Sequence, residues 1–448
     1  MAEHLSPLDA SLLNVEDADR HTNLGMGALA VLDGPMPDHQ TLMSVLGERI
    51  AACPRFAQRL RRRLFDLGSP EWVADPNFKL ANHVCGIAVP GAGSDDDLFS
   101  VVAEVMSWRL ERDRPLWEIW VIGGLSGGRW AMLVKVHPCI ADAVATVHIL
   151  AGLSDEGPAR GTMPGAVTAA AGGWRGALRV ASSIATATVA GVMRTDQALR
   201  DAAEFAAGLR RPATPLNGPL TSRRRRYVSA RVSAAEVDQI CQTFDVTVDD
   251  VALAALTESY RNMMVRRGEQ PKSDSLRTLV PLRQALLLPR LPVDEDNPVV
   301  RLRLVHARLA QARADADRSP AGAVAAVARA IPVPLTAWAA NLLSRLPQRS
   351  VVALAASVPG PGRPLAVMGC PVAAVLPVPP IAMQLRTGAA ILRYADSLFF
   401  GIVSDYSTVR DADELARGVE AAVARLLVRS RRRRAGRDRH GLSLVVNV

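Results

Sequence analysis

The segment from Val134 to Thr146 places a histidine, a cysteine and an aspartate within a few residues of one another. It reads VKVHPCIADAVAT, so His137, Cys139 and Asp142 follow an apolar, strand-like run and precede a helix-like one. A turn between a strand and a helix is a usual place for a polar side chain to face a cleft, where a histidine can remove a proton from a reacting group. A lone histidine is also commonly a structural residue, so both interpretations stay open for this segment taken alone.

Other catalytic signatures are absent from the sequence. It contains no GxSxG elbow, no GxxxxGK[ST] phosphate loop and no GxGxxG following a strand. The five cysteines are scattered and form no CxxC pair: Cys53, Cys85, Cys139, Cys241 and Cys370. They predict neither a disulfide framework nor a zinc site, and they fit a reducing compartment.

The N-terminal third of the chain alternates strand-like and helix-like segments. These are the strand-like Gly27 to Gly34, the amphipathic run Gln40 to Leu64, the helix-like Asp96 to Leu110, and the strands Trp117 to Ile122 and Trp130 to Val136. This alternation predicts an α/β lobe over residues 1–153.

A second α/β pattern follows a segment rich in Ala, Gly and Thr. That segment, residues 154–219, ends in RRPATPLNGP and is interpreted as the crossing between domains. Residues 220–428 form the second predicted lobe, with a strand from Tyr227 to Val232, a helix from Ser233 to Phe244, a helix capped by Thr247, a strand from Ser397 to Val403, and a closing helix from Asp411 to Leu427.

The composition is that of a globular protein with a net positive charge. The chain has 448 residues, 49% hydrophobic and 22% charged, which allows two domains of roughly 150 to 200 residues. The net charge of +9 favours acidic partners. Basic runs lie at Arg223 to Arg226 and in the predicted tail, residues 429–448, where a solvated tail and a membrane-surface role remain alternatives.

The sequence predicts no secretory signal and no transmembrane helix. The N-terminus lacks a basic region followed by an apolar one. The longest low-charge stretch, Ala177 to Met193, is interrupted by Arg179 and is shorter than the ~20 apolar residues that span a bilayer. A helix packed on the protein or lying on a membrane surface remains open.

Several phrases, in order, resemble the bacterial wax ester synthase/diacylglycerol acyltransferase family. They are LSPLDASLL at Leu5 to Leu13, RPLWE at Arg114 to Glu118, HPCIADA at His137 to Ala143, PLNGPLTSRRRR at Pro215 to Arg226, TVDDVALAAL at Thr247 to Leu256, SVPGP at Ser357 to Pro361, and FFGIVSD at Phe399 to Asp405. The resemblance covers nearly the whole chain up to Val428. It implies two α/β lobes similar to chloramphenicol acetyltransferases and condensation domains, joined by a helical crossover, with a tunnel between them.

The family's central motif is HHxxxDG, whose second histidine deprotonates an alcohol that attacks the acyl-CoA thioester. Laid on this sequence, the motif places its first histidine at His137, the base at Pro138, the structural aspartate at Asp142 and the glycine at Ala143. Proline cannot accept a proton. His137 is a candidate catalytic residue displaced by one, but alternation along a strand predicts that it shares a face with Lys135 rather than with Pro138.

The resemblance also implies roles for other residues. Pro115, Leu116 and Trp117 are expected near the cleft as substrate-binding residues, with core packing as the alternative. Ala143, Ser357 and Gly360 are further substrate-binding candidates, the last two in a tight loop at the domain interface. Arg283 is a candidate partner for Asp142 through a charge-assisted hydrogen bond. Cys139, Asp142 and His148 are weak alternatives for the base.

The sequence therefore predicts an acyl-CoA-dependent O-acyltransferase that makes triacylglycerol or wax ester, slowed by Pro138, since a general base contributes ~10² to 10⁴ in rate. The alternative is an inactive relative that binds acyl-CoA or lipid as a regulator or scaffold. The expected partners are acyl-CoA and diacylglycerol or a fatty alcohol, with no cofactor, no metal and no nucleic acid. The expected location is cytoplasmic, with peripheral contact at the inner membrane face or lipid droplets.

Overall fold

The computed structural model describes residues 3–5, 7–62, 70–156, 220–272, 276–282, 285–287, 290–318, 351–381 and 385–443. Most of the predicted crossing between domains, the low-charge stretch from Ala177 to Met193, and Arg283 lie outside these residues. Among the described residues, no helix combines the length and the apolar character needed to cross a membrane.

The first large sheet has six described strands in the order β12-β13-β2-β7-β6-β5. In chain order these strands are β2 (Met26–Leu32), β5 (Val84–Ala88), β6 (Trp117–Gly123), β7 (Trp130–Val136), β12 (Ala366–Val367) and β13 (Cys370–Val378). Every residue of β2 and β7 is buried, as expected for central strands covered on both faces. Only β5 and β6 pair in parallel among these described strands; the other pairs are antiparallel.

Short helices and a small sheet surround the first sheet. The helices are α1 (Pro7–Ala18), α2 (His39–Ala51), α3 (Asp95–Val105) and α4 (Ala143–Gly152). The small sheet has the order β1-β4-β3, formed by β1 (Glu3–His4), β3 (Gln58–Arg61) and β4 (Glu71–Ala74). The predicted amphipathic run from Gln40 to Leu64 is wrong as a single element: α2 ends at Ala51, because Pro54 disfavours helical backbone at the residue before it, and β3 follows.

The second large sheet belongs to the C-terminal lobe and has the described order β10-β9-β11-β14-β15-β8. Its strands are β8 (Arg225–Ser233), β9 (Arg277–Leu282), β10 (Ala285–Leu287), β11 (Val351–Val358), β14 (Thr387–Tyr394) and β15 (Ser397–Asp405). Its helices are α7 (Ala234–Phe244), α8 (Val248–Arg266), α9 (Pro298–Arg318) and α12 (Ala412–Ser443). Thr247 caps α8 in a reciprocal box with Asp250, which confirms the predicted cap.

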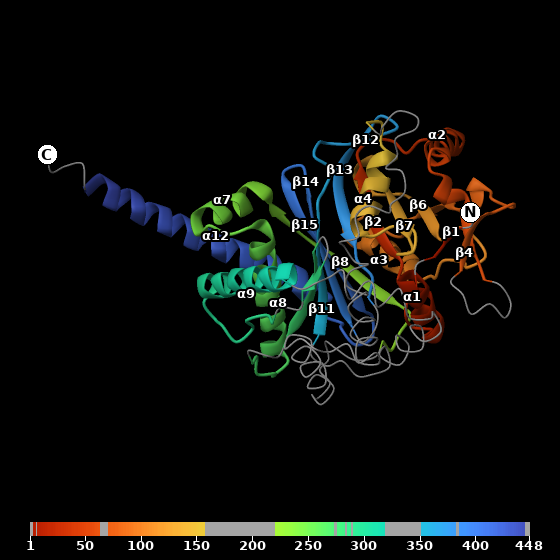
Figure 1. The fold of residues 1–448 in the computed structure, drawn as a ribbon. Helices are drawn as coiled ribbons and strands as arrows, with labels where there is room; N and C mark the ends of the chain where they lie inside the picture. The colour runs from red at the N-terminus through yellow and green to blue at the C-terminus, as the bar shows by residue number, and fades with distance from the viewer. Residues whose placement is uncertain are drawn as a thin grey trace, which may run out of the picture.

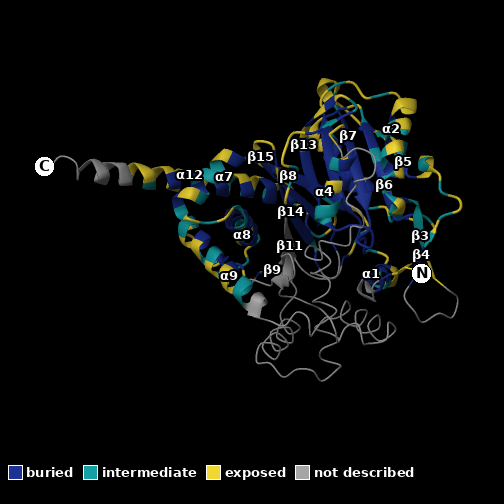
Figure 2. Ribbon diagram, turned by 45° about the horizontal axis from the view of Figure 1, so that its top comes forward, coloured by how far each residue is buried: buried dark blue, intermediate teal, exposed yellow. Residues whose placement is uncertain are grey.

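Two hydrophobic clusters lie against these sheets. One fills the first lobe and extends onto the facing side of the second sheet, where it includes Tyr227, Leu392 and Phe399, and the other lies within the second lobe. Figure 1 shows the lobes side by side, and Figure 2 shows buried strands in both, with the exposed residues mainly on the outer helices and loops. The predicted α/β class with two lobes is confirmed.

One hairpin crosses from the C-terminal part of the chain into the first sheet. β13 pairs with β2 along its length and also contacts β14 and β15 of the second sheet. The approach is close enough that a Cβ atom at Gly401 would lie 1.7 Å from the carbonyl oxygen of Pro377. Sheet membership therefore does not follow the predicted boundary near residue 220, because an exchanged strand leaves no mark in local sequence.

The C-terminal helix is longer than the sequence indicates. α12 continues without interruption to Ser443, so the arginines assigned to a basic tail belong to this helix. Figure 1 shows its last turns projecting away from the lobes.

Candidate functional site

The segment from His137 to Asp142 forms a buried turn between β7 and α4. The N–H of His137 donates to the carbonyl of Leu116 at 3.0 Å, and the N–H of Ile140 donates back to the His137 carbonyl at 2.9 Å. The turn is therefore fastened to the start of β6 and to itself. This confirms the strand, turn and helix expected from the sequence pattern.

Asp142 occupies the N-cap of α4. Its carboxylate accepts the N–H of Ala145 at 2.8 Å, and its carbonyl accepts the hydroxyl of Thr146 at 2.7 Å. A cap of this kind satisfies one of the amides left unpaired at the start of a helix. The expected pairing with Arg283 stays a prediction because that arginine lies outside the described residues.

Ala143 is the first residue of α4 and has ordinary helical backbone. It is not among the described residues with positive φ, so the alanine introduces no backbone strain here. Alanine is also a better helix former than glycine, by about 1 kcal/mol. Alanine at this position therefore fits the turn without strain.

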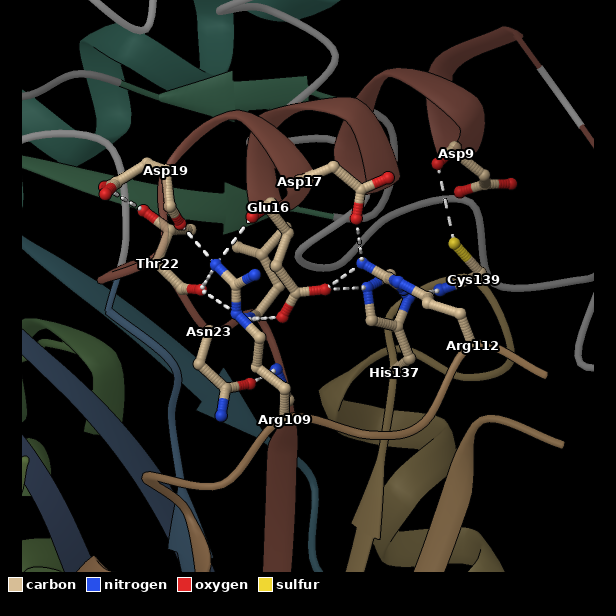
Figure 3. A network of polar contacts seen from close by, with 12 residues as sticks. Asp9, Glu16, Asp17, Asp19, Thr22, Asn23, Arg109, Arg112, His137 and Cys139 are labelled. Carbon is tan, nitrogen blue, oxygen red and sulfur yellow. Dashed lines mark hydrogen bonds and ion pairs between the residues drawn. The ribbon is translucent and has the colours of Figure 1, made fainter. Parts of the chain in front are cut away.

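His137 is almost fully buried, with 1% of its side chain exposed. Its Nδ1 atom accepts the N–H of Cys139 at 3.2 Å, so in the neutral ring the proton resides on Nε2. Nε2 lies 3.3 Å from Oε2 of Glu16 on α1. Figure 3 shows the imidazole directed at this carboxylate, with Arg112 beside the imidazole and directed at the same oxygen, Oε2.

Glu16 is a site residue that the sequence analysis missed. It is buried, forms an ion pair with Arg112, and accepts the N–H of Leu24 at 3.0 Å. Burial alone would raise the pKa of its carboxyl, but the contact with His137, the charge of Arg112 and the Leu24 amide outweigh burial and lower this pKa to about 2. The available signal was its place on α1, three and four residues after Leu13 and Leu12, on an otherwise apolar face.

The same surroundings keep the imidazole of His137 neutral. Burial lowers the pKa of His137 below its usual 6.5, and the nearby Glu16 carboxylate offsets this only in part. A neutral ring with one nitrogen accepting a backbone amide and the other donating toward Glu16 has no lone pair left for a substrate hydroxyl. In this arrangement His137 links the motif turn to α1.

Lys135 fulfils the strand-alternation argument made from the sequence. Its ammonium group is buried and donates to the carbonyls of Val105 at 3.0 Å and Trp108 at 2.7 Å. Lys135 thus faces the end of α3 and the segment after it, whereas His137 contacts Glu16 on α1 and the amide of Cys139.

The other two candidates for the base are placed differently. Cys139 is buried, with its thiol 3.5 Å from the carbonyl oxygen of Asp9. His148 is exposed on the outside of α4. The structure brings neither of them together with Ala143 at the crevice described next.

An apolar crevice lies between the lobes at the start of α4. It is lined from the first lobe by Met26, Gly27, Ala143 and Val147, from the second by Val358 and Ala390, and by residues 377–380 at the end of β13. The crevice is narrow, since only about 20 Å³ of it is wide enough to admit a water molecule. Ala143 is thus the residue through which the motif borders a hydrophobic space shared by both lobes.

The remaining predicted substrate-binding residues divide into two groups. Pro115, Leu116 and Trp117 are buried in the first core, where the indole N–H of Trp117 donates to the Phe56 carbonyl at 2.9 Å. Their contact with substrate stays a prediction, and the packing observed is that of core residues. The SVPGP segment borders the crevice through Val358.

Within that segment, Ser357 is the penultimate residue of β11, and its side chain lies outside the described residues. Gly360 packs so closely that a Cβ atom there would lie 1.7 Å from the carbonyl oxygen of Arg393. This close packing explains why residue 360 is a glycine. A contact between Gly360 and substrate stays a prediction.

Comparison with known proteins assigns the chain to a family. The model of the wax ester synthase/diacylglycerol acyltransferase catalytic domain matches residues 5–252, and the model of the C-terminal domain of the same family matches residues 283–426. The chain belongs to the wax ester synthase/diacylglycerol acyltransferase family. The resemblance inferred from the motifs is thereby confirmed, and the chain is an acyltransferase by family.

Individual relatives agree with this assignment. The chain is 51% identical over 465 residues to tgs1 of Mycobacterium tuberculosis (strain ATCC 25618 / H37Rv), named a probable diacylglycerol O-acyltransferase, with 99% of this chain and 100% of the relative covered. The two chains therefore match from end to end.

Solved structures show the same fold. A wax ester synthase/diacylglycerol acyltransferase from Marinobacter aquaeolei VT8 has a TM-score of 0.72 at 24% identity, covering 95% of this chain and 99% of that one. The first condensation domain of the calcium-dependent antibiotic synthetase has a TM-score of 0.57 at 15% identity, covering 95% and 96%. At these identities the likeness concerns the fold alone.

Proposed function

We propose that this protein transfers a fatty acyl group from acyl-CoA to the hydroxyl of diacylglycerol or of a long-chain alcohol. The observation that carries the proposal is the apolar crevice between the lobes, bordered by Ala143 of the motif turn. Family membership supplies the reaction type, and the hydrophobic lining of the crevice suits an acyl chain.

In this reaction the hydroxyl oxygen attacks the thioester carbonyl, the carbon–sulfur bond breaks, and the hydroxyl proton ends on the departing thiolate of CoA. Neither Pro138 nor the engaged imidazole of His137 is suited to move that proton. Rate enhancement then rests on holding thioester and alcohol together, since well-oriented reactants alone supply effective molarities on the order of 10⁵ to 10⁸ M. The expected turnover is lower by ~10² to 10⁴ than with a positioned base.

The engaged nitrogens of His137 also favour a second candidate function. A family member without an accessible base would bind acyl-CoA or lipid without turning it over, and would serve as a regulator or scaffold. This function needs the crevice and the fold but no proton acceptor.

Purified protein incubated with radiolabelled palmitoyl-CoA and diacylglycerol, or with hexadecanol, tests the first function against the second. Labelled triacylglycerol or wax ester above the level of a heat-treated sample supports the transferase. Saturable palmitoyl-CoA binding without labelled ester supports the binder. Neither ester nor binding would contradict both.

We propose that the protein contacts an anionic lipid surface and that the reaction takes place there. Arginines in the second half of α12, including Arg429 and Arg432, are exposed on a helix that projects from the lobes. Each such residue contributes about 1 kcal/mol of attraction near an anionic membrane. Sedimentation with vesicles containing phosphatidylglycerol, compared with neutral vesicles, measures this contact.

A further inference from the structure

A second hollow, which we call the basic cleft, opens where the start of the C-terminal lobe meets the first lobe. About 770 Å³ of the hollow is not filled by protein atoms, and part of this space is open to solvent. Its lining includes Arg20, His21, Trp108, Arg109, Arg223 and Arg224. We propose that this cleft binds the phosphates and the adenine ring of the CoA moiety of the acyl donor. The proposal rests on the proposed acyl-CoA-dependent function.

The charge of the cleft is of one sign. Arg20, Arg223 and Arg224 are exposed, and none of the described residues that line the cleft is acidic. Arginine presents several N–H donors in a planar fork that matches phosphate oxygens, and clustered positive charge raises the local concentration of an anionic ligand. Three exposed guanidinium groups from two separate chain segments therefore predict a ligand with more than one phosphate.

The arginines are held in place by the protein. The Nε of Arg223 donates to the carbonyl of Arg20 at 3.0 Å, which joins the two segments, and the guanidinium of Arg224 lies 4.1 Å from the centre of the Tyr406 ring. Arg109 donates to the carbonyls of Glu16, Asp19 and Thr22, as Figure 3 shows, and so fixes the loop that carries Arg20. Its charge is engaged with carbonyl dipoles rather than with a carboxylate in these bonds.

Trp108 distinguishes a nucleotide site from a site for a simple anion. Its side chain is 41% exposed at the cleft, although tryptophan is usually well buried. Its backbone is fixed, because the Trp108 carbonyl accepts both the Asn23 amide and the Lys135 ammonium at 2.7 Å. A fixed, exposed indole beside arginines is suited to stack on an adenine ring.

The basic cleft and the apolar crevice border the same short stretch of chain. Asn23 lines the cleft, Met26 and Gly27 line the crevice, and Asn23 forms a bridge with Ile381, next to the crevice residue Pro380. Three residues of chain span at most about 11 Å. The short separation of the two hollows along the chain is consistent with one acyl-CoA molecule that has its phosphates in the cleft and its acyl chain in the crevice.

Calorimetric titration of the full chain with adenosine 3′,5′-bisphosphate, the phosphate-bearing nucleotide portion of CoA, tests the proposal. The double variant Arg223→Ala/Arg224→Ala should bind this probe at least about tenfold more weakly. Trp108→Ala should weaken its binding to a similar extent and leave the binding of inorganic pyrophosphate unchanged. The matched control Arg429→Ala/Arg432→Ala removes the same charge from α12 and should change neither titration. Thermal unfolding verifies the fold of each variant, and Arg20→Ala replaces the double variant if that one does not fold.

Equal affinity of the wild type and the Arg223→Ala/Arg224→Ala variant for the bisphosphate would overturn the proposal. The proposal would also be overturned if the α12 control lost as much affinity for the bisphosphate and for pyrophosphate as the cleft variant does. If the cleft variant instead loses only its sedimentation with phosphatidylglycerol vesicles, the cleft serves a lipid headgroup and the proposal for CoA is wrong.

Failure of the proposed function gives a different result. Suppose that the protein forms no ester, but that its binding of the bisphosphate is weakened in the cleft variant. The proposed transferase function is then wrong, and the proposed role of the cleft is supported. If the cleft variant forms ester and its KM for acyl-CoA is unchanged, the proposed role of the cleft is wrong and the transferase function is supported.

Discussion

Nε2 of His137 lies 3.3 Å from Oε2 of Glu16, and both side chains are sealed from solvent. The pair joins the motif turn in the middle of the first lobe to α1 at its edge. Burial keeps the histidine neutral, and its Nε2 and the guanidinium of Arg112 both lie against the same oxygen, Oε2, of the Glu16 carboxylate. The polar contacts made by His137 therefore all lie within the first lobe.

Replacement of Glu16 by Gln should change how stability depends on pH. The carboxyl has its pKa lowered from 4.5 to about 2 in the folded chain, so below pH 4.5 the unfolded state binds the proton first. Its contribution, about 3 kcal/mol from that shift, is present above pH 4.5 and is lost as pH falls toward 2. Urea unfolding at a series of pH values should show the difference between wild type and Glu16→Gln shrinking over that window. A constant difference would contradict the buried pair.

Replacement of His137 by Gln should leave most of any transferase activity. A glutamine amide can accept the Cys139 N–H and donate toward Glu16, so it can preserve the link without a titrating group. We expect kcat to fall by less than about tenfold, whereas loss of a general base would cost ~10² to 10⁴. Initial rates of ester formation on either side of pH 6.5 measure this, and a large loss in kcat with an unchanged unfolding midpoint would identify His137 as the base.

Replacement of Pro138 by His should raise the rate of ester formation. The family motif expects its base at this position, and an imidazole there would add a proton acceptor that proline lacks. The expected gain in kcat is on the order of 10² or more, with KM for acyl-CoA little changed. Pro138→Gln is the matched control, since it adds a polar side chain without a base. Equal rates in the two variants would show that position 138 does not face the reacting hydroxyl.

Replacement of Gly360 by Ala should destabilise the loop after β11. The added methyl group would lie 1.7 Å from the Arg393 carbonyl oxygen, so the loop or β14 must move. We expect a loss of about 1 to 3 kcal/mol in unfolding free energy, typical of overpacking. Gly362→Ala is the control, because a Cβ atom there meets nothing within 4 Å. Equal unfolding midpoints for the two variants in thermal denaturation would contradict this packing.

Local sequence was sufficient for many elements of the fold. Alternation predicted the strand from Trp130 to Val136 and the turn after it, and side-chain chemistry predicted the cap at Thr247. The order of the motifs predicted the family and hence two α/β lobes. These features depend on residues close together in sequence, where periodicity and capping act.

Contacts between distant residues were decided only by tertiary structure. The sequence showed a histidine beside a proline, but only the packing of α1 against the motif turn placed the Glu16 carboxylate next to Nε2 of His137. The sequence also showed an arginine run near residue 223, but only the packing of the two lobes places that run beside Arg20 and Trp108. Strand exchange through β13 likewise left no local mark, because pairing partners are chosen by burial and register across the whole chain rather than by neighbouring residues.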